Sequence, residues 1–146
     1  MKRLSQLLSA VLGLVLVVWL NGDAATATKT RDVCIVNPTG GGSLNTFIFR
    51  EVGPLDRGQA IPVQGLFFTG ARRVAPFHGS AAMVSDGTVR LGLFVHATAE
   101  STNDFTISGV TDTTFVGTLS FDNDGDFVPN GTLAMEVADC ASISIP

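Results

Sequence analysis

The residues best suited to bind a metal ion are the aspartates of the stretch SFDNDGDF, residues 120–127. Asp122, Asp124 and Asp126 alternate with other residues, and carboxylate oxygens are ligands that Ca²⁺ prefers. An EF-hand loop starting at Asp122 would need glycine at its sixth position and glutamate at its twelfth, where the chain has Phe127 and Leu133. The stretch is therefore not an EF-hand. Two interpretations stay open, a modest calcium site and a solvated turn.

The same stretch has the chemistry of a hairpin tip. Asn123-Asp124-Gly125 repeats the pattern of Ser85-Asp86-Gly87, with glycine third in each. That register places Phe121 opposite Phe127 and sets the two outer aspartates opposite each other. Like charges in such positions destabilise a hairpin by up to about 1 kcal/mol, and a bound cation would reverse the sign of this contribution.

His78 and His96 are the only histidines of the chain. The strand register described below places them diagonally on one face, with backbones about 7–8 Å apart. That separation is long for a shared metal ion, and no third ligand is evident. We therefore expect them to be surface residues without a joint role.

Other known site motifs are missing from the sequence. The glycine-rich stretch 38–43 lacks the Lys-Ser/Thr ending of a phosphate-binding loop, and no G-x-S-x-G elbow occurs. No catalytic residues are predicted, so an enzyme is the least supported class of function. The 9 basic residues are scattered among 13 acidic ones, which argues against nucleic acid as a partner.

The first 27 residues have the pattern of a secretory signal peptide. Lys2 and Arg3 precede the apolar run Leu7–Leu20, and Ala25-Thr26-Ala27 supplies small residues for cleavage. The run is shorter than the roughly 20 residues that span a bilayer. The sequence thus predicts a signal peptide over 1–27, a single all-β domain over 28–146 that is not membrane-spanning, and a secreted, periplasmic or extracellular location.

Cys34 and Cys140 are the only cysteines and lie near opposite ends of the predicted domain. In an exported protein such a pair indicates a disulfide. A disulfide needs Cα atoms about 5–6 Å apart, so the first and last strands must be neighbours. Two free buried thiols are the alternative.

The sequence between the two cysteines shows no helical periodicity. Runs rich in Val, Phe, Thr and Ile alternate with Gly, Pro, Asp and Asn, which is typical of an all-β domain. The predicted strands are 32–37, 45–52, 60–69, 74–84, 88–98, 104–110, 113–121 and 131–140. Odd positions are mostly apolar, so the odd face should be buried. A three-residue turn at 85–87 preserves that parity, pairing Met83 with Val89.

About eight antiparallel strands in sequence order, with the ends clamped together, predict an up-and-down meander closed into a small barrel. Inward Gly65, Gly79, Gly109 and Gly117 would allow the sharp coiling that such a barrel requires. A two-sheet β-sandwich is the alternative. The barrel is similar in shape to lipocalins and avidins, but the tryptophans that those families use are absent. An outer-membrane barrel would need girdles of Trp and Tyr, which the predicted domain lacks.

Two functions follow from this architecture. The first is an exported barrel that binds a small apolar molecule in its interior. The second is a structural or adhesive module of the cell exterior, with a weak calcium-binding loop and a solid core. A lined cavity above about 300 Å³ would favour the first. The residues expected to face the ligand are Phe49, Phe67, Phe77, Leu93, Phe105, Phe115 and Met135.

Asn130-Gly131-Thr132 also fits a glycosylation acceptor. The oligomeric state is not predicted.

Overall fold

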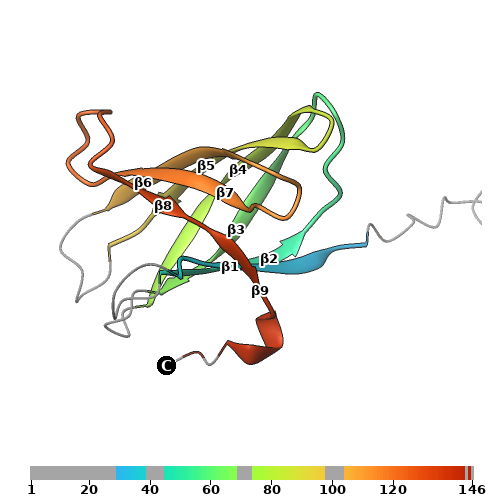
Figure 1. The fold of residues 1–146 in the computed structure, drawn as a ribbon, viewed down its shortest axis with the longest axis horizontal. Coiled ribbons are helices and arrows are strands. Elements are labelled where there is room, and N and C mark those ends of the chain that lie inside the picture. Colours follow the sequence, from blue (N-terminus) through green and yellow to red (C-terminus); the bar gives the residue numbers. More distant parts are fainter. Residues whose placement is uncertain (1–28, 39–44, 69–73, 98–103, 144, 146) are drawn as a thin grey trace, which may run out of the picture.

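The computed structural model describes residues 29–38, 45–68, 74–97, 104–143 and 145. The predicted signal peptide, residues 1–27, lies outside this part of the chain. The described residues form one antiparallel sheet in the order β8-β7-β6-β5-β4-β3-β2-β1-β9 (Figure 1). The elements are β1 (Arg31–Val36), β2 (Thr46–Val52), β3 (Ala60–Phe68), β4 (Val74–Ser85), β5 (Thr88–Val95), β6 (Phe105–Thr111), β7 (Gly117–Asp122), β8 (Gly131–Ala134), β9 (Glu136–Ala138) and the 3₁₀ turn η1 (Cys140–Ser142).

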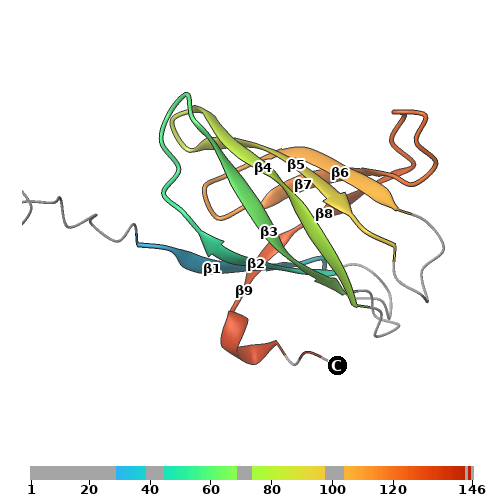
Figure 2. The ribbon, with the colours of Figure 1, turned by 180° about the vertical axis from the view of Figure 1, so that it is seen from behind.

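The two edges of the sheet are joined by the chain itself. β8 pairs with β7 and β9 pairs with β1, yet only Met135 separates β8 from β9. The sheet therefore curls into a nearly closed barrel, visible from both sides in Figures 1 and 2. The predicted meander and barrel are confirmed, and the two-sheet sandwich is wrong. The strand predicted over 131–140 divides because Met135 turns its side chain into the core, while its N–H donates to the Gly117 carbonyl at 2.8 Å.

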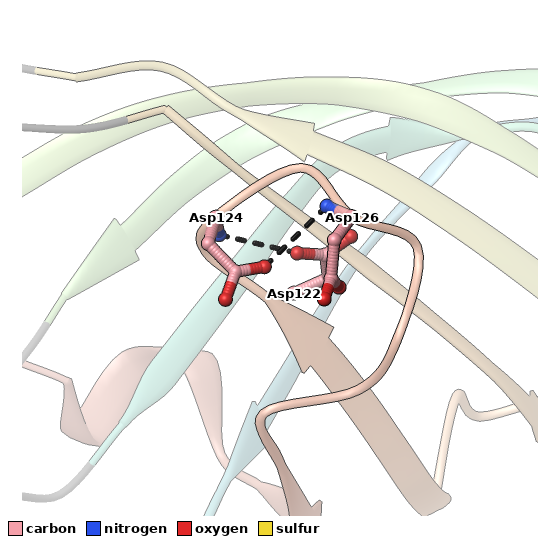
Figure 3. A group of neighbouring side chains, drawn as sticks. All are labelled: Asp122, Asp124 and Asp126. Atoms are coloured by element: carbon pink, nitrogen blue, oxygen red, sulfur yellow. Dashed lines mark hydrogen bonds between the residues drawn. The ribbon is translucent and has the colours of Figure 1, made fainter.

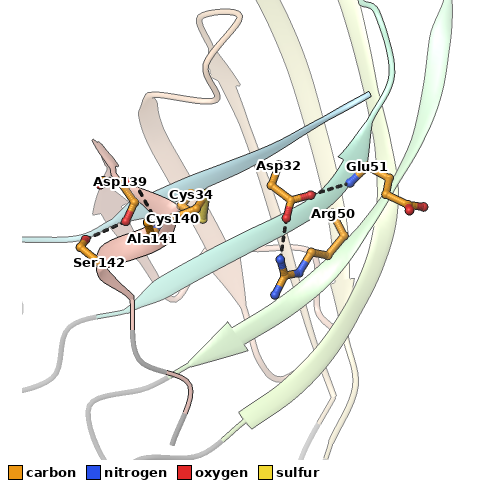
Figure 4. The surroundings of a disulfide bond; sticks show 8 residues. All are labelled: Asp32, Cys34, Arg50, Glu51, Asp139, Cys140, Ala141 and Ser142. Carbon is orange, nitrogen blue, oxygen red and sulfur yellow. Dashed lines mark hydrogen bonds and ion pairs between the residues drawn. A yellow bond between two sulfur atoms is a disulfide. The ribbon is translucent and has the colours of Figure 1, made fainter. Parts of the chain in front are cut away.

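The predicted disulfide is present. Cys34 on β1 is bonded to Cys140 in η1, with Cα atoms 5.3 Å apart and a sequence separation of 106 (Figure 4). Closing a loop of this length contributes about 4–5 kcal/mol in the chain-entropy description. Cys140 lies beyond the end of β9, so the last predicted strand ends at Ala138 rather than at residue 140.

A small apolar cluster surrounds the disulfide on the outer face of the barrel. Cys34, Ile48 and Phe68 are buried there, and Ala138 and Ile143 pack against them. These β-strand residues include even positions, which the alternation predicted to be wetter. They are buried because the segment from Ala138 to Ile143 covers this part of the outer face, a contact that parity within one strand does not predict.

The odd face of the strands forms the main core, as predicted. Phe47, Phe49, Leu91, Val95 and Leu119 are almost fully buried inside the barrel. Besides the buried even residues of β1, β2 and β3 described above, the alternation fails at Val137 on β9, an odd position that is 65% exposed. Burial of one alternate face per strand is the main source of stability for a sheet of this kind.

The hairpin between β4 and β5 has the predicted register. Met83 pairs with Val89 and Phe77 with Val95, and the pairing shifts next to the turn, where Ser85 faces Thr88. Gly87 has φ +74, the left-handed conformation that a three-residue hairpin loop requires at this position. The turn therefore keeps odd residues facing odd residues.

The inward glycines lie where strands approach very closely. A Cβ added to Gly65 would lie 1.9 Å from the Ile48 carbonyl oxygen, and one added to Gly79 would lie 2.0 Å from the Gly92 carbonyl oxygen. A side chain at either position would displace the neighbouring strand. Sharp coiling of β3 and β4 therefore depends on glycine, as expected for a small barrel.

A β-bulge in β2 is held by Asp32 of β1. The β1–β2 register shifts between Arg31 and Val33, and Glu51 has φ +51. One carboxylate oxygen of Asp32 accepts from the Glu51 N–H at 3.0 Å and the other pairs with the Arg50 guanidinium (Figure 4). These hydrogen bonds, the Glu51 N–H first, lower the pKa of Asp32 below 3.8.

The connection between β6 and β7 differs from the prediction. The expected strand 113–121 begins only at Gly117, and residues 112–116 form a loop. Phe115 enters the core from this loop with φ +63 rather than from a strand. The alternation identified its buried side chain but not its backbone conformation.

The connection between β7 and β8 covers residues 123–130, close to the 122–130 left between the predicted strands, but it is not the predicted three-residue hairpin. Phe121 pairs with Gly131, and the Asn130 N–H donates to the Phe121 carbonyl at 2.8 Å. Phe121 therefore does not face Phe127, and the predicted short hairpin register is wrong. The loop spans residues 123–130, because Asp122 organises its backbone in the way described below.

Candidate functional sites

All seven residues predicted to face a ligand belong to the barrel interior. Five strands and two connecting segments bring them into one apolar cluster, in which Phe105 alone is only half-buried. The cluster residues from the prediction are Phe49, Phe67, Phe77, Leu93, Phe105, Phe115 and Met135. Their inward orientation follows from the odd parity of the strands; ligand binding by them stays a prediction.

Phenylalanine rings fill the middle of the interior. The Phe49 ring centroid lies 4.6 Å from that of Phe115 and 4.9 Å from that of Phe77. The ring centroids of Phe47 and Phe67 are 4.7 Å apart. Aromatic pairs at such distances are in direct contact. A ligand could not occupy this level of the barrel without displacing the rings.

An apolar pocket lies at one end of the barrel, next to the end of β7. Its walls are Phe67, Phe105, Phe121 and Leu133, and Asn45 borders it with Asn123; its volume is about 260 Å³. Phe67 is buried, whereas the other apolar wall residues are half-buried. We call these six residues the end pocket. Of the predicted ligand-facing residues, it contains Phe67 and Phe105.

The three aspartates form a compact cluster (Figure 3), and Asn123 of the end pocket lies between two of them in the sequence. One carboxylate oxygen from each of Asp122, Asp124 and Asp126 lies within 4.8 Å of the others. Asp122 is buried at the end of β7, and the other two side chains are exposed on the loop. The structure therefore brings together the three residues that the sequence singled out.

The cluster is organised by hydrogen bonds to the loop backbone. One oxygen of Asp122 accepts from the Gly125 N–H at 2.9 Å, and the other accepts from the Phe127 N–H, also at 2.9 Å. The side-chain amide of Asn130 donates to Asp124 at 3.0 Å and, together with the Asp126 N–H, lowers the pKa of Asp124. Asp124 is therefore charged at neutral pH, in the state that a hard cation requires.

The predicted glycosylation acceptor Asn130 lies at the exposed end of this loop. Its side-chain oxygen accepts from the Asn123 N–H at 2.7 Å, and its amide nitrogen binds Asp124. Asn130 is thus a structural part of the loop in this conformation.

The histidines differ from the expectation for unrelated surface residues. Nδ1 of His78 lies 2.9 Å from Nε2 of His96, and the ring centroids are 4.8 Å apart. The register itself is as predicted, since His78 pairs with Phe94 and the His96 N–H donates to the Pro76 carbonyl at 3.0 Å. The separation of the backbones does not reveal this contact, because the length and rotamer of the two imidazoles bring their nitrogens together.

Two wall residues of the end pocket were also missed as ligand-facing candidates. Phe121 and Leu133 occupy odd positions and follow the same alternation as the seven residues that were chosen. Parity could therefore have found them. The two asparagines at the pocket border carry no comparable sequence pattern.

Comparison of the chain with protein-family models, with curated proteins and with solved structures finds no match. Within the described residues, no helix has the length and apolar character needed to cross a bilayer. The functional inference therefore depends on the geometry of the barrel and its sites.

Proposed function

We propose that this protein is an exported binding protein whose end pocket accepts a small apolar molecule. The observation that carries the proposal is the apolar lining of that pocket by Phe67, Phe105, Phe121 and Leu133. Ligand sites commonly combine apolar walls with a few polar groups that orient the ligand. The side chains of Asn45 and Asn123 are placed to act as such groups.

The size of the pocket limits the ligand class. Its volume of about 260 Å³ lies just below the range of roughly 300–1,000 Å³ that is usual for drug-sized ligands. A cavity of about 150 Å³ lined by aliphatic and aromatic residues is enough for benzene. The pocket volume therefore supports a ligand of one or two aromatic rings or a short acyl chain, bound at the barrel end rather than in its filled middle.

Export is proposed from the pattern of residues 1–27 and is supported by the disulfide, because such bonds persist in oxidising compartments. Intact mass spectrometry of protein recovered from outside the cytoplasm tests it. Cleavage near Ala27 would remove Trp19, the only tryptophan of a chain without tyrosine, and with it almost all absorbance at 280 nm. An uncleaved mass would overturn this part of the proposal.

Titration with a neutral naphthylamine dye, whose fluorescence rises in apolar sites, tests the end pocket. We expect saturable binding by the folded protein with one site per chain. Leu133→Asp should weaken binding by about tenfold or more, because a carboxylate in the apolar wall must be desolvated by the dye. Competition by short-chain alcohols and substituted benzenes then ranks the ligand classes.

Val137→Asp is the matched control, since Val137 lies in the same chain segment but is 65% exposed on β9. It should bind the dye like the wild type. Equal urea midpoints for both variants exclude dye binding to partly unfolded protein. Equal affinity in all three proteins, or no binding by the folded wild type, would refute the end-pocket proposal.

The filled middle of the barrel favours a second candidate, a structural or adhesive module of the cell exterior. In that role the aspartate cluster would bind Ca²⁺ and stiffen the 123–130 loop. The specific observation is the contact of Phe49 with Phe77 and Phe115, which leaves a solid core. Such a module would present its loops, rather than a cavity, to its partners.

Thermal unfolding with added CaCl₂ tests this candidate. Ca²⁺ should raise the melting temperature of the wild type but not of Asp124→Asn, because ligand binding to the folded state alone is stabilising. Asp86→Asn is the control, as Asp86 lies in the other Asp-Gly turn, 3.7 Å from Arg57. It should respond like the wild type. No calcium response in the wild type would exclude the calcium part of this candidate.

A further inference from the structure

The outer face of the barrel carries a histidine pair that neither proposed function uses. His78 lies on β4 and is exposed, and His96 directly follows β5 and is half-exposed. Their facing nitrogens, Nδ1 of His78 and Nε2 of His96, are 2.9 Å apart. A hydrogen bond at this distance requires that one imidazole presents an N–H and the other an unprotonated nitrogen.

Backbone hydrogen bonds between β4 and β5 hold both histidines in place. His78 lies within the paired stretch of β4 and faces Phe94 of β5, and the His96 N–H is bonded to the Pro76 carbonyl. The Phe94 ring centroid lies 5.6 Å from that of His78 and 5.0 Å from that of His96. Phe94 thus packs beside both imidazoles and restricts their rotamers. Little conformational entropy remains to be lost when both rings bind one ligand.

The separation of the two nitrogens matches that of ligands on one metal ion. Metal–imidazole bonds of about 2.0–2.1 Å at right angles place two neighbouring ligand nitrogens about 2.8–3.0 Å apart. Right-angled coordination by nitrogen is typical of Cu²⁺ and Ni²⁺. A small rotation of the exposed His78 ring would direct both lone pairs to one ion, which would replace the shared proton.

We propose that His78 and His96 form a two-imidazole chelate for a divalent transition metal, with Cu²⁺ bound most tightly. Cu²⁺ stands highest among the divalent first-row ions in affinity for nitrogen sites. The remaining coordination positions face solvent, because the pair lies on the outer face of the sheet. The site is separate from the end pocket and from the aspartate cluster, and it does not depend on the proposed function.

The composition of the chain makes the proposal unusually easy to test. These are the only two histidines, and both cysteines are held in the disulfide. Imidazole binding of copper is therefore assigned to this pair, and thiol binding is excluded. Copper bound by the amino terminus of the purified chain would be the same in every variant.

The experiment is calorimetric titration of the folded, disulfide-bonded protein with CuCl₂ at neutral pH, followed by electron paramagnetic resonance. We expect one Cu²⁺ per chain that depends on the histidines, with hyperfine structure from two nitrogens. His78→Gln and His96→Gln should each weaken binding by roughly 100-fold, at the lower end of the gain from linking two binding groups. Acidification should also weaken binding, since protons compete for the imidazoles.

Two further variants complete the test. Asp124→Asn removes a carboxylate of the aspartate cluster and should leave copper affinity unchanged, whereas Phe94→Ala should weaken it less than loss of either histidine. Circular dichroism of each variant verifies the fold. The proposal is overturned if both histidine variants bind as the wild type does, if Asp124→Asn abolishes binding, or if the spectrum shows a single nitrogen.

Discussion

In two loops of the barrel, an aspartate side chain organises the backbone in the same way, but the phenylalanine of one loop is buried and that of the other is exposed. In the 112–116 loop, Asp112 accepts from the Thr114 N–H at 2.7 Å and from the Val116 N–H at 3.1 Å. In the 123–130 loop, Asp122 accepts from the Gly125 and Phe127 N–H groups, both at 2.9 Å. Each loop also contains a phenylalanine with φ +63, Phe115 in the first and Phe127 in the second.

The difference lies in where each phenylalanine goes. Phe115 is 0% exposed and packs against Phe49, whereas Phe127 is 90% exposed. The first loop thus fills the core near one end of the barrel. The second leaves its apolar side chain in solvent. An aspartate that organises a turn therefore sets the local backbone conformation. The length of the loop and its neighbours decide whether the phenylalanine of that turn is buried in the core or exposed to solvent.

The largest effect expected from this comparison is on stability. Phe115→Ala should lower the free energy of unfolding by about 3–5 kcal/mol, because it removes a fully buried ring and leaves a cavity. Phe127→Ala should leave it almost unchanged, since an exposed ring loses little burial. Urea unfolding of both variants, followed by far-UV circular dichroism, measures the difference.

Similar stability losses for the two variants would contradict the contrast between a buried Phe115 and an exposed Phe127. It would mean that Phe127 is buried in solution, either against the loop or against another molecule. Phe115→Leu is the conservative variant of the first position and should lose less than Phe115→Ala, because it keeps most of the buried volume.

A smaller effect on stability is expected at acidic pH. It separates the contribution of the Asp112 charge from that of its side-chain size. Burial alone would raise the pKa of Asp112, but hydrogen bonds from the Thr114 hydroxyl and N–H and from the Val116 N–H outweigh it, and the pKa is lowered from 3.8. A lowered folded-state pKa contributes stability above about pH 4 that is lost as pH falls through the folded value. Asp112→Asn should therefore be less stable than wild type near neutral pH, and the difference should shrink below about pH 4.

Urea midpoints of wild type and Asp112→Asn at several pH values give the measurement. A difference that stays constant from neutral to acidic pH would show that the charge of Asp112 contributes nothing to the loop. Asp32 has a lowered pKa too, owing to the Glu51 N–H and Arg50, so part of the acid sensitivity should remain in the variant.

Most of the barrel could be predicted from residue order. Odd-position apolar residues such as Leu91 and Leu119 identified the core, because a strand exposes alternate side chains to opposite faces. Two cysteines near opposite ends of the predicted domain identified the disulfide. The turn at 85–87 was predictable because only one loop length keeps the parity across β4 and β5.

The errors were made where the chain departs from regular pairing. Phe115 was assigned to a strand because parity cannot distinguish an inward strand residue from an inward loop residue. The short register opposite Phe121 failed because Asp122 holds a longer loop through side-chain bonds to its backbone. The histidine pair was missed because side-chain reach, rather than strand register, brings the rings together.

The order of residues alone determined a β-meander with a buried odd face, a disulfide between its ends and an acidic loop, because each follows from local periodicity or from a single pairing choice. The tertiary structure decided how the last strand changes partners at Met135, that the phenylalanine rings fill the middle of the barrel, and that His78 meets His96. These features depend on the curvature of the whole sheet, to which every strand contributes and which no single stretch of sequence encodes.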